Sequence, residues 1–460
     1  MSLHTLTTMA LCLMIYTVPL ALPLTVYRPD YGPKWLVFHL FLWVALVPLL
    51  VEGYLRRISL YTPFLLPAFS FLGIGCLSTL WNGIGPQTSY ELYRQTSIVV
   101  LLLVAVKGAL PQCQKQVLWV ALLTGSFVSL IGILQAHKIC LLTLSVPMPP
   151  SSTFVNRNVA AEYITCCALV ALRLLLAERC RLSNLLVGSS GLALMLLFLV
   201  ETRCRTAWLA VVCGVLIFYY HSQKSHRNLG ILLMTLGTLL IMITSLIAFQ
   251  LPIPGKGTVL QTVNSIIHPN SGPGAFAYTS RVGLWKGTLD MIKDYPILGV
   301  GPGRWFEVYP VYDHGRVLSS ERIASSPHND FLWIASEYGL LGLGCLVWFV
   351  VVVLRRAFST SNFLQRVFLI SFGLAYSVLS FFAFPKDHPQ APMLLCMALG
   401  MSIGRSDREH DRHWCNRLDL PLALFFVMMS LGSLALSWWQ VLLDHHRFPY
   451  FFVSRTSGTL

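Results

Sequence analysis

Long apolar runs dominate this chain, each of about 17–25 residues, the length that crosses a bilayer as a helix. Hydrophobic residues make up 55% of the chain and charged residues 11%, more apolar surface than a soluble fold of this length buries. We therefore expect an all-α integral membrane protein with about 12–13 transmembrane helices. The expected spans are 5–26, 35–53, 60–80, 95–111, 116–137, 158–177, 184–200, 206–220, 229–250, 329–354, 364–384, 390–404 and 418–440.

Lys and Arg residues concentrate in every second short loop, for example at Arg56 and Arg57, at Lys107, and at Arg355 and Arg356. Because short loops rich in Lys and Arg stay cytoplasmic, these loops are predicted to be inside. The interval 251–327 then lies outside, as do the loops near 138–157, 201–205 and 385–389. The net charge of +14 reflects this topology, so we expect no nucleic-acid partner.

The predicted spans divide the chain into four parts. Residues 1–250 hold about nine spans, 251–327 form the external loop, 328–440 hold about four spans and 441–460 form a tail. The 12 cysteines are scattered and include no CxxC pair, which favours neither a zinc site nor a disulfide framework. We expect no metal and no cofactor.

The external loop has a turn-rich first part and an ordered second part. Val282, Trp285, Leu289 and Ile292 follow helical spacing after a possible cap at Ser280, which predicts an amphipathic helix that Pro296 ends. A glycine-rich segment follows at 299–304. No GK[ST] comes after it and no strand precedes it, so a plain turn is favoured over a phosphate-binding loop.

The segment 325–342 begins the next span with its polar residues first. Ser326 is a predicted N-cap and Pro327 stands where a proline at the first helical position is favoured. This assignment places His328 in the first helical turn, where the helix dipole disfavours a protonated ring and attracts anions. A neutral imidazole there is a candidate general base for a phosphate ester substrate, although a lone histidine at a membrane boundary is more often structural.

Arginines at two other external positions are candidate anion ligands. Arg203 and Arg205 lie at a span junction beside Glu201, and Arg281 lies at the expected start of the amphipathic helix. Arginine presents planar paired donors that suit a diphosphate. The alternative for the junction is interfacial snorkelling with a Glu201–Arg203 ion pair, and for Arg281 a solvated side chain.

Several further residues are candidates for lining the same cavity. They are Asn156, Arg304, Asn329, Asp330, Lys386 and His388. The structural interpretations are a helix cap at the neighbouring Asn158, a plain turn around Arg304 and a solvated loop. A multi-span transporter is the alternative from outside the enzyme class, but transporters place polar groups near the midplane on broken helices. Here the polar groups are expected at one face, and charges in the middle of spans are few, His39 being one exception.

The motifs resemble the signature region of the O-antigen ligase and polymerase superfamily. They are Thr153-Phe-Val-Asn-Arg-Asn, Thr202-Arg-Cys-Arg-Thr-Ala-Trp-Leu, Ser280-Arg-Val-Gly-Leu-Trp, Tyr295-Pro-Ile-Leu-Gly-Val-Gly-Pro-Gly, Ser326-Pro-His-Asn-Asp-Phe-Leu-Trp and Glu337-Tyr-Gly-Leu-Leu-Gly. The resemblance covers roughly residues 150–345. It implies a glycosyltransferase-C-like bundle with one long periplasmic loop, in the inner membrane of a bacterium, with its active site facing the periplasm.

The family transfers a glycan from an undecaprenyl-diphosphate carrier without a metal ion and with inversion. Carried over, its histidine falls on His328, its arginine after the long loop on Arg281, and its arginine at the span junction on Arg205. The chain departs from the family pattern by Cys204 in place of a common serine and by the second arginine, Arg203. The resemblance favours a ligase that uses the lipid A–core oligosaccharide as acceptor. A glycan polymerase and a protein O-oligosaccharyltransferase remain the alternatives within the superfamily.

The topology generates a first prediction. Single cysteines placed in 251–327 or at Arg205, in a chain lacking its native cysteines, should react with a membrane-impermeant maleimide added outside the inner membrane. A cysteine in the loop that contains Arg355 and Arg356 is the control and should stay unlabelled. Labelling of the 251–327 loop only after the membrane is opened would contradict the topology.

Overall fold

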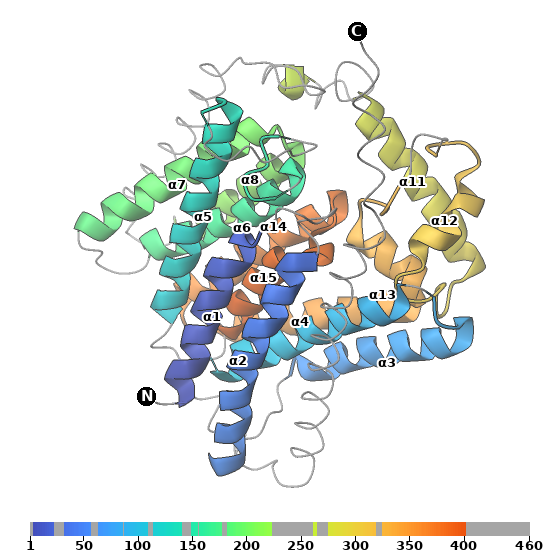
Figure 1. The fold of residues 1–460 in the computed structure, drawn as a ribbon, viewed down its shortest axis with the longest axis horizontal. Coiled ribbons are helices and arrows are strands. Elements are labelled where there is room, and N and C mark those ends of the chain that lie inside the picture. Colours follow the sequence, from blue (N-terminus) through green and yellow to red (C-terminus); the bar gives the residue numbers. More distant parts are fainter. Residues whose placement is uncertain are drawn as a thin grey trace.

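The computed structural model describes residues 3–22, 32–56, 63–85, 87–108, 114–139, 149–154, 156–176, 182–222, 261–264, 275–318 and 324–401, and within these ranges the regular elements are helices (Figure 1). Among the described residues, eight helices are long and apolar enough to cross a membrane, and three shorter apolar helices accompany them. The prediction of an all-α integral membrane protein is confirmed. The elements are α1 (Leu3–Leu20), α2 (Gly32–Arg56), α3 (Leu65–Asn82), α4 (Thr88–Gly108), α5 (Gln114–Ala136), α6 (Arg157–Leu176), α7 (Leu182–Thr202), α8 (Arg205–Ser222), α11 (Ala275–Asp294), α12 (Trp305–Asp313), α13 (Asp330–Ser359), α14 (Phe363–Phe382), the 3₁₀ turn η1 (Pro385–Asp387) and α15 (Gln390–Gly400).

The predicted spans agree with these helices wherever the structure describes them. Two predicted spans, 229–250 and 418–440, lie outside the described residues, as do the tail 441–460 and most of 251–274. Boundaries differ most at α4, which begins at Thr88 and not at 95. The apolar run marks only the second part of this helix, which is buried in the bundle, so the polar first turns were missed.

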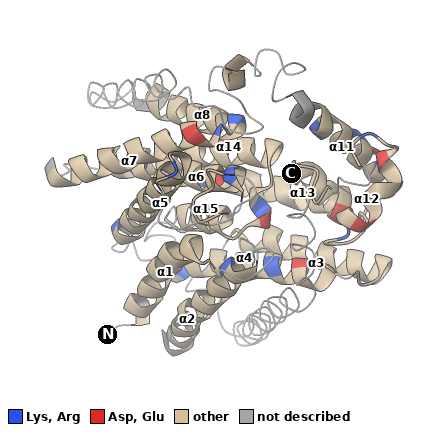
Figure 2. Cartoon of the chain, turned by 45° about the horizontal axis from the view of Figure 1, so that its top comes forward, with Lys and Arg blue, Asp and Glu red and all other residues tan. Residues whose placement is uncertain are grey.

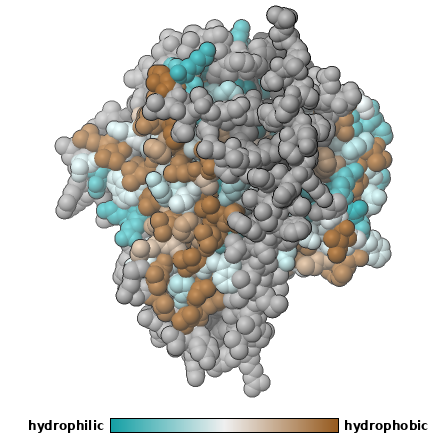
Figure 3. All heavy atoms as spheres, in the orientation of Figure 1, coloured by the Kyte–Doolittle hydropathy of each residue, from teal (hydrophilic) through white to brown (hydrophobic). Residues whose placement is uncertain are grey.

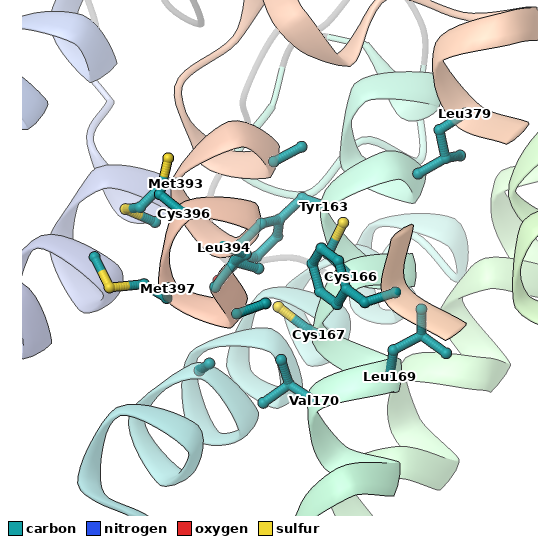
Figure 4. Close-up of a cluster of buried hydrophobic side chains, with 14 of the residues drawn as sticks. Tyr163, Cys166, Cys167, Leu169, Val170, Leu379, Met393, Leu394, Cys396 and Met397 are labelled. Carbon is teal, nitrogen blue, oxygen red and sulfur yellow. The ribbon is translucent and has the colours of Figure 1, made fainter. Parts of the chain in front are cut away.

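Helix α6 is the central element of the bundle. It packs against α5, α7, α8, α14 and α15, and nearly all of its side chains are buried. Figure 4 shows Tyr163, Cys166 and Cys167 of α6 beside Met393 and Cys396 of α15. The two α6 thiols are buried and free, as expected of packing cysteines. Small residues allow the helices to approach closely, because a Cβ added to Gly125 of α5 would lie 2.7 Å from the Cβ of Cys167.

Apolar side chains cover the outer helices, and charged residues lie further inside. Met9, Leu13 and Tyr16 of α1 and Leu40 and Val44 of α2 are exposed, and Figure 3 shows apolar surface where Figure 1 places these two helices. Figure 2 shows α1, α2 and α7 largely free of charge, with Lys, Arg, Asp and Glu positions among α4, α6, α8 and α13. This distribution suits a bundle whose solvent is lipid.

Helix α13 is broken at Gly339, and the glycine-rich segment before α12 fills the break. Gly339 has φ 68° and ψ −174°, so the carbonyls of the preceding turn lose their helical partners. The N–H of Val300 donates to the Ser336 carbonyl (2.9 Å) and the N–H of Gly301 to the Glu337 carbonyl (3.0 Å), while the Leu340 N–H donates to the Pro296 carbonyl (2.8 Å). The segment 296–301 thus supplies hydrogen-bond partners for the backbone groups at the break in α13. It is a structural segment and not a phosphate-binding loop.

The amphipathic helix is present as α11, but its start and its buried face differ from the expectation. The helix begins at Ala275, so Ser280 is not its cap and Arg281 lies in its second turn. Leu284, Thr288 and Met291 are buried, whereas Leu289 is exposed. Helix α11 packs against α12 and α13, and α12, which the sequence pattern did not predict, shields one side of it. Because α11 packs against α12 as well as α13, its buried face is shifted by one position from the expected one.

The break in α13 generates a second prediction. A Cβ on Gly339 would overlap the Ile297 carbonyl, and φ 68° disfavours any L side chain. Gly339→Ala should therefore lower the melting temperature of the purified protein, equivalent to roughly 2–4 kcal/mol of stability.

Gly344→Ala, five residues further along the same helix, is the matched control. Nothing lies within 4 Å of a Cβ at Gly344, so this change should be neutral or stabilise by about 0.5–1 kcal/mol. Equal melting temperatures for the two variants would show that the break is not needed.

Candidate active site

The segment before α13 presents His328 outside the helix. Asn329 is the N-cap, its Oδ1 accepting the Leu332 N–H at 3.0 Å, and the helix begins at Asp330. The predicted cap at Ser326 and the placement of His328 in the first helical turn are therefore wrong. Asn329 directly precedes the first helical residue. Its side-chain oxygen therefore reaches an N–H of the first turn that has no acceptor within the helix. His328 instead has φ 54°, a left-handed conformation that costs energy for a histidine.

The His328 ring is held between α11 and the end of α14. The Pro327 carbonyl accepts the Trp285 indole N–H at 3.0 Å, which ties this segment to α11. The His328 ring packs on Phe384, with ring centroids 5.0 Å apart, and its Nδ1 has no hydrogen-bond partner among the described residues. Burial, and after it the charge of Arg281, lowers the pKa of His328 to about 3. The ring is therefore neutral at physiological pH, with one nitrogen available to take a proton.

Arg281, whose charge acts on this histidine, also lies near Arg205 of a different element. Arg281 projects from the second turn of α11, and Arg205 is the first residue of α8. Burial lowers the pKa of Arg281, and Cys204, Arg205 and Glu162 are the groups whose charges act on it. Two guanidinium groups so close to each other repel, and a bound anion relieves that repulsion. Arg281 thus links the three residues carried over from the family motifs: its charge acts on His328, and the charge of Arg205 acts on it.

Arg203 belongs to a different set of contacts. It is fully buried, has φ 53° and donates from Nη1 to the Val200 carbonyl at 3.1 Å. Burial lowers its pKa, Glu201 opposes that shift and Arg157 adds to it. Its electrostatic neighbours are thus Glu201 and Arg157, which matches the ion-pair interpretation of the junction. Of the two junction arginines, Arg205 is the one beside Arg281.

Lys386 lies in a buried ion network behind the cluster. Its Nζ lies 3.0 Å from Glu91 Oε1 and 3.7 Å from the centroid of the Trp333 ring. Burial alone would lower the pKa of Lys386, but Glu91, Glu337, Asp387 and Asp330 raise it. The lysine is therefore charged and paired within the protein.

The same network fixes the start of α13 and the η1 turn. Arg94 of α4 pairs with Asp387 (2.7 Å) and with Glu91 (3.3 Å). Asp330 accepts the Lys386 backbone N–H through Oδ2 at 3.2 Å. Asp330 is thus joined to α4 through Lys386. It also lies two residues from His328, on the helix whose cap presents that ring.

The remaining predicted residues take mainly structural positions. His388 is buried with its ring 5.8 Å from Phe384, so this phenylalanine lies between His328 and His388. Arg304 donates to the Asn82 carbonyl at 2.6 Å and lies beside Glu307. Asn156 caps α6, where its Oδ1 accepts the Asn158 N–H at 2.8 Å. Asn158, not Asn156, was the expected cap.

Sequence reasoning missed three charged residues inside apolar helices. Glu91 and Arg94 lie in the first two turns of α4, and Glu162 lies in the first two turns of α6. All three lie in the first two turns of their helices, so they do not bear on the expectation that mid-span charges are few. An ionisable residue within an apolar helix is itself the signal that could have found them. His39 is hydrogen-bonded to Ser97 at 2.9 Å, a packing role.

Fold and site together define a multi-span α-helical membrane protein with a cationic cluster beside a neutral histidine. Residues 190–347 match the family described as O-antigen ligase (Wzy_C). This match confirms the resemblance to the O-antigen ligase and polymerase superfamily, whose members are glycosyltransferase-like enzymes. A search of curated proteins found no match. Within the described part of the chain, no group of three His, Cys, Asp or Glu residues is placed to hold a metal ion.

The arginine cluster generates a third prediction. Farnesyl diphosphate, a short prenyl diphosphate, should bind the purified protein, and Arg281→Ala or Arg205→Ala should weaken binding by roughly 10-fold or more. Lysine at either position should restore little, because it keeps the charge but loses the paired donors. Arg203→Ala should change affinity less than either.

Arg316→Ala is the control for these titrations. Arg316 also contacts α11, through Asp290 at 3.3 Å, but both side chains are about one-third exposed and surface pairs contribute little. Its affinity should equal that of the unchanged protein. Unchanged affinity in both the Arg281 and Arg205 variants would remove the diphosphate assignment.

Proposed function

We propose that the chain is a ligase-type glycosyltransferase. It moves a glycan from an undecaprenyl-diphosphate carrier to a hydroxyl group of the lipid A–core oligosaccharide, at the periplasmic face of the bacterial inner membrane. The family match at 190–347 supports the reaction class. The observation that carries the proposal is the position of His328 beside Arg281, close enough for the arginine charge to lower the histidine pKa.

The chemistry follows from that juxtaposition. Arg281 and Arg205 hold the donor diphosphate, and the acceptor hydroxyl approaches His328 from the opposite side of the anomeric carbon. His328 takes the hydroxyl proton as the acceptor oxygen forms its bond to that carbon. The bond from the carbon to the diphosphate oxygen breaks, and its electron pair leaves with the diphosphate, where the arginines stabilise the growing charge. The anomeric centre inverts, and the step needs no metal ion because a diphosphate is already a competent leaving group.

The donor also changes the base. The charge of Arg281 contributes, after burial, to the low pKa of His328. A bound diphosphate offsets that charge, so the pKa of His328 rises and the imidazole becomes a better proton acceptor. Donor binding therefore activates the general base, in addition to supplying the glycan.

The acceptor distinguishes the three activities of the superfamily. Purified protein and a carrier-linked glycan should be incubated with lipid A–core, with more carrier-linked glycan, or with a serine-containing peptide. The proposal requires product with lipid A–core. Product only with a second carrier-linked chain would make the protein a polymerase, and product only with the peptide a protein O-oligosaccharyltransferase. Movement of the carrier without transfer would favour a transporter.

A fourth prediction concerns pH. The free-enzyme pKa appears in kcat/KM and that of the substrate complex in kcat. Since only unprotonated His328 is active, both parameters should fall as pH decreases through the respective pKa, and the fall in kcat should begin at higher pH. If kcat and kcat/KM fell at the same pH, activation of His328 by the donor would be contradicted.

His328→Asn removes the base while suiting the left-handed backbone, which asparagine tolerates. It should lower kcat by roughly 10²–10⁴-fold with donor affinity retained. His314→Asn is the matched control, because exposed His314 also has a left-handed backbone, φ 48°, at the end of α12. His314→Asn should keep a normal kcat and the same pH dependence of kcat and kcat/KM as the unchanged protein. Normal turnover in His328→Asn would remove His328 from the mechanism.

A further inference from the structure

Glu162 is a buried carboxyl group that the mechanism above does not use. It lies in the first two turns of α6, the central helix, and only 2% of it is exposed. Its Oε1 has no hydrogen-bond partner among the described residues. A buried polar atom without a partner costs folding free energy. The position of Glu162 therefore calls for a functional explanation.

The neighbours of Glu162 place it at the candidate active site. Asp330 is the charged group that acts on it most strongly, followed by Asp387 and Arg281. Asp330 has the same defect, because its Oδ1 is buried and has no hydrogen bond within the described part of the chain. The carboxyl groups of Glu162 on α6 and Asp330 on α13 thus lie near each other, and Arg281 also acts on Glu162. Each carboxyl group has one buried oxygen without a hydrogen bond to a described residue.

His328 and Ser326 add further unused polar atoms to this place. His328 Nδ1 and Ser326 Oγ are both buried and make no hydrogen bond to any described residue. Both residues lie within four positions of Asp330 in the segment that begins α13. The unused atoms come from two separate elements, α6 and the start of α13, which is the arrangement of a site awaiting a polar ligand.

The available atoms define the chemistry of that ligand. A carboxyl group accepts hydrogen bonds through its oxygens and, when protonated, also donates one, so a ligand that both donates and accepts suits it best. A fully ionised diphosphate only accepts, and in the proposed function Arg281 and Arg205 already supply its donors. A metal ion is disfavoured by the adjacent charge of Arg281. Sugar hydroxyl groups are uncharged and both donate and accept, so they suit these atoms best.

We propose that Glu162 belongs to the acceptor subsite, where its Oε1 accepts a hydrogen bond from a sugar hydroxyl next to the hydroxyl that His328 deprotonates. Asp330 accepts from the same sugar on the other side. This assignment rests on the proposed function and narrows it, because it calls for an acceptor that presents several hydroxyl groups. An isolated serine or threonine hydroxyl would leave the Glu162 oxygen without a partner.

Steady-state kinetics on Glu162→Leu and Glu162→Gln test the assignment. Glu162→Leu should raise the acceptor KM roughly 10-fold to 100-fold and leave donor affinity within about twofold of the unchanged protein. Glu162→Gln keeps an acceptor oxygen without the charge, so its effect should be smaller. The melting temperature of the leucine variant should not fall, because an unpartnered buried carboxyl is removed.

Glu201→Gln is the matched control. Glu201 is also 2% exposed with an unpartnered Oε1, but the charges that act on it are Arg203 and His137, not the cluster at His328. Its acceptor KM should be unchanged. An unchanged acceptor KM in both Glu162 variants, or a change that falls on donor affinity, would overturn the assignment.

A binding measurement without donor separates this proposal from the proposed function. The probe is delipidated core oligosaccharide, titrated into purified protein and followed by tryptophan fluorescence. If the unchanged protein binds the probe and Glu162→Leu does not, while neither transfers glycan, the subsite stands and the function fails. If transfer occurs but Glu162→Leu binds the probe normally, the subsite fails and the function stands. Absence of probe binding to the unchanged protein also overturns the subsite.

Discussion

The junction between the 296–301 segment and the break at Gly339 positions α11 and the start of α13 at the candidate active site. A helix broken inside a membrane protein leaves carbonyls that water cannot reach, so other backbone donors must satisfy them. Val300 and Gly301 do so. The first part of α13 is thereby fixed against α11 and α12 separately from the part that follows, which at about 20 residues is long enough to cross the bilayer alone. His328 and Arg281 meet because this junction joins the helices that carry them.

A second constraint is the buried ion network of α4, η1 and α13. Arg94 and Lys386 face four carboxyl groups, those of Glu91, Asp387, Asp330 and Glu337. Such networks are weak evidence for stability, because desolvation of the ions opposes their attraction. They do constrain geometry, however, because each buried charge must stay beside its partner; removal of one partner leaves an uncompensated buried charge. The network thus locates Asp330 and the η1 turn relative to each other, and with them the two histidines that flank Phe384.

Sequence patterns predicted the helices better than the features at their ends. Apolar runs identify the spans because the bilayer sets their length, so α5 and α14 begin and end close to expectation. Cap choice between Ser326 and Asn329 depends on competing hydrogen bonds and on the Trp285 contact to Pro327, which no local pattern contains. The family motifs indicated His328, Arg281 and Arg205. Glu162 lies outside every motif considered; its place in an apolar helix is the sequence signal for it, and its burial near Asp330 shows where it lies.

The proposed mechanism gives the cluster an order of events. Without donor, Arg281 and burial keep His328 a weak base, so an acceptor hydroxyl that arrives first meets no effective proton acceptor. With donor in place, the diphosphate offsets the arginine charge, and the base strengthens at the moment when the leaving group is present. The same logic limits hydrolysis: water makes one or two of the hydrogen bonds that a sugar makes to Glu162 and Asp330, so it is held less well beside His328. In this mechanism Glu162 and Asp330 favour the acceptor sugar over water. Arg281 makes the strength of the base depend on whether the donor is bound.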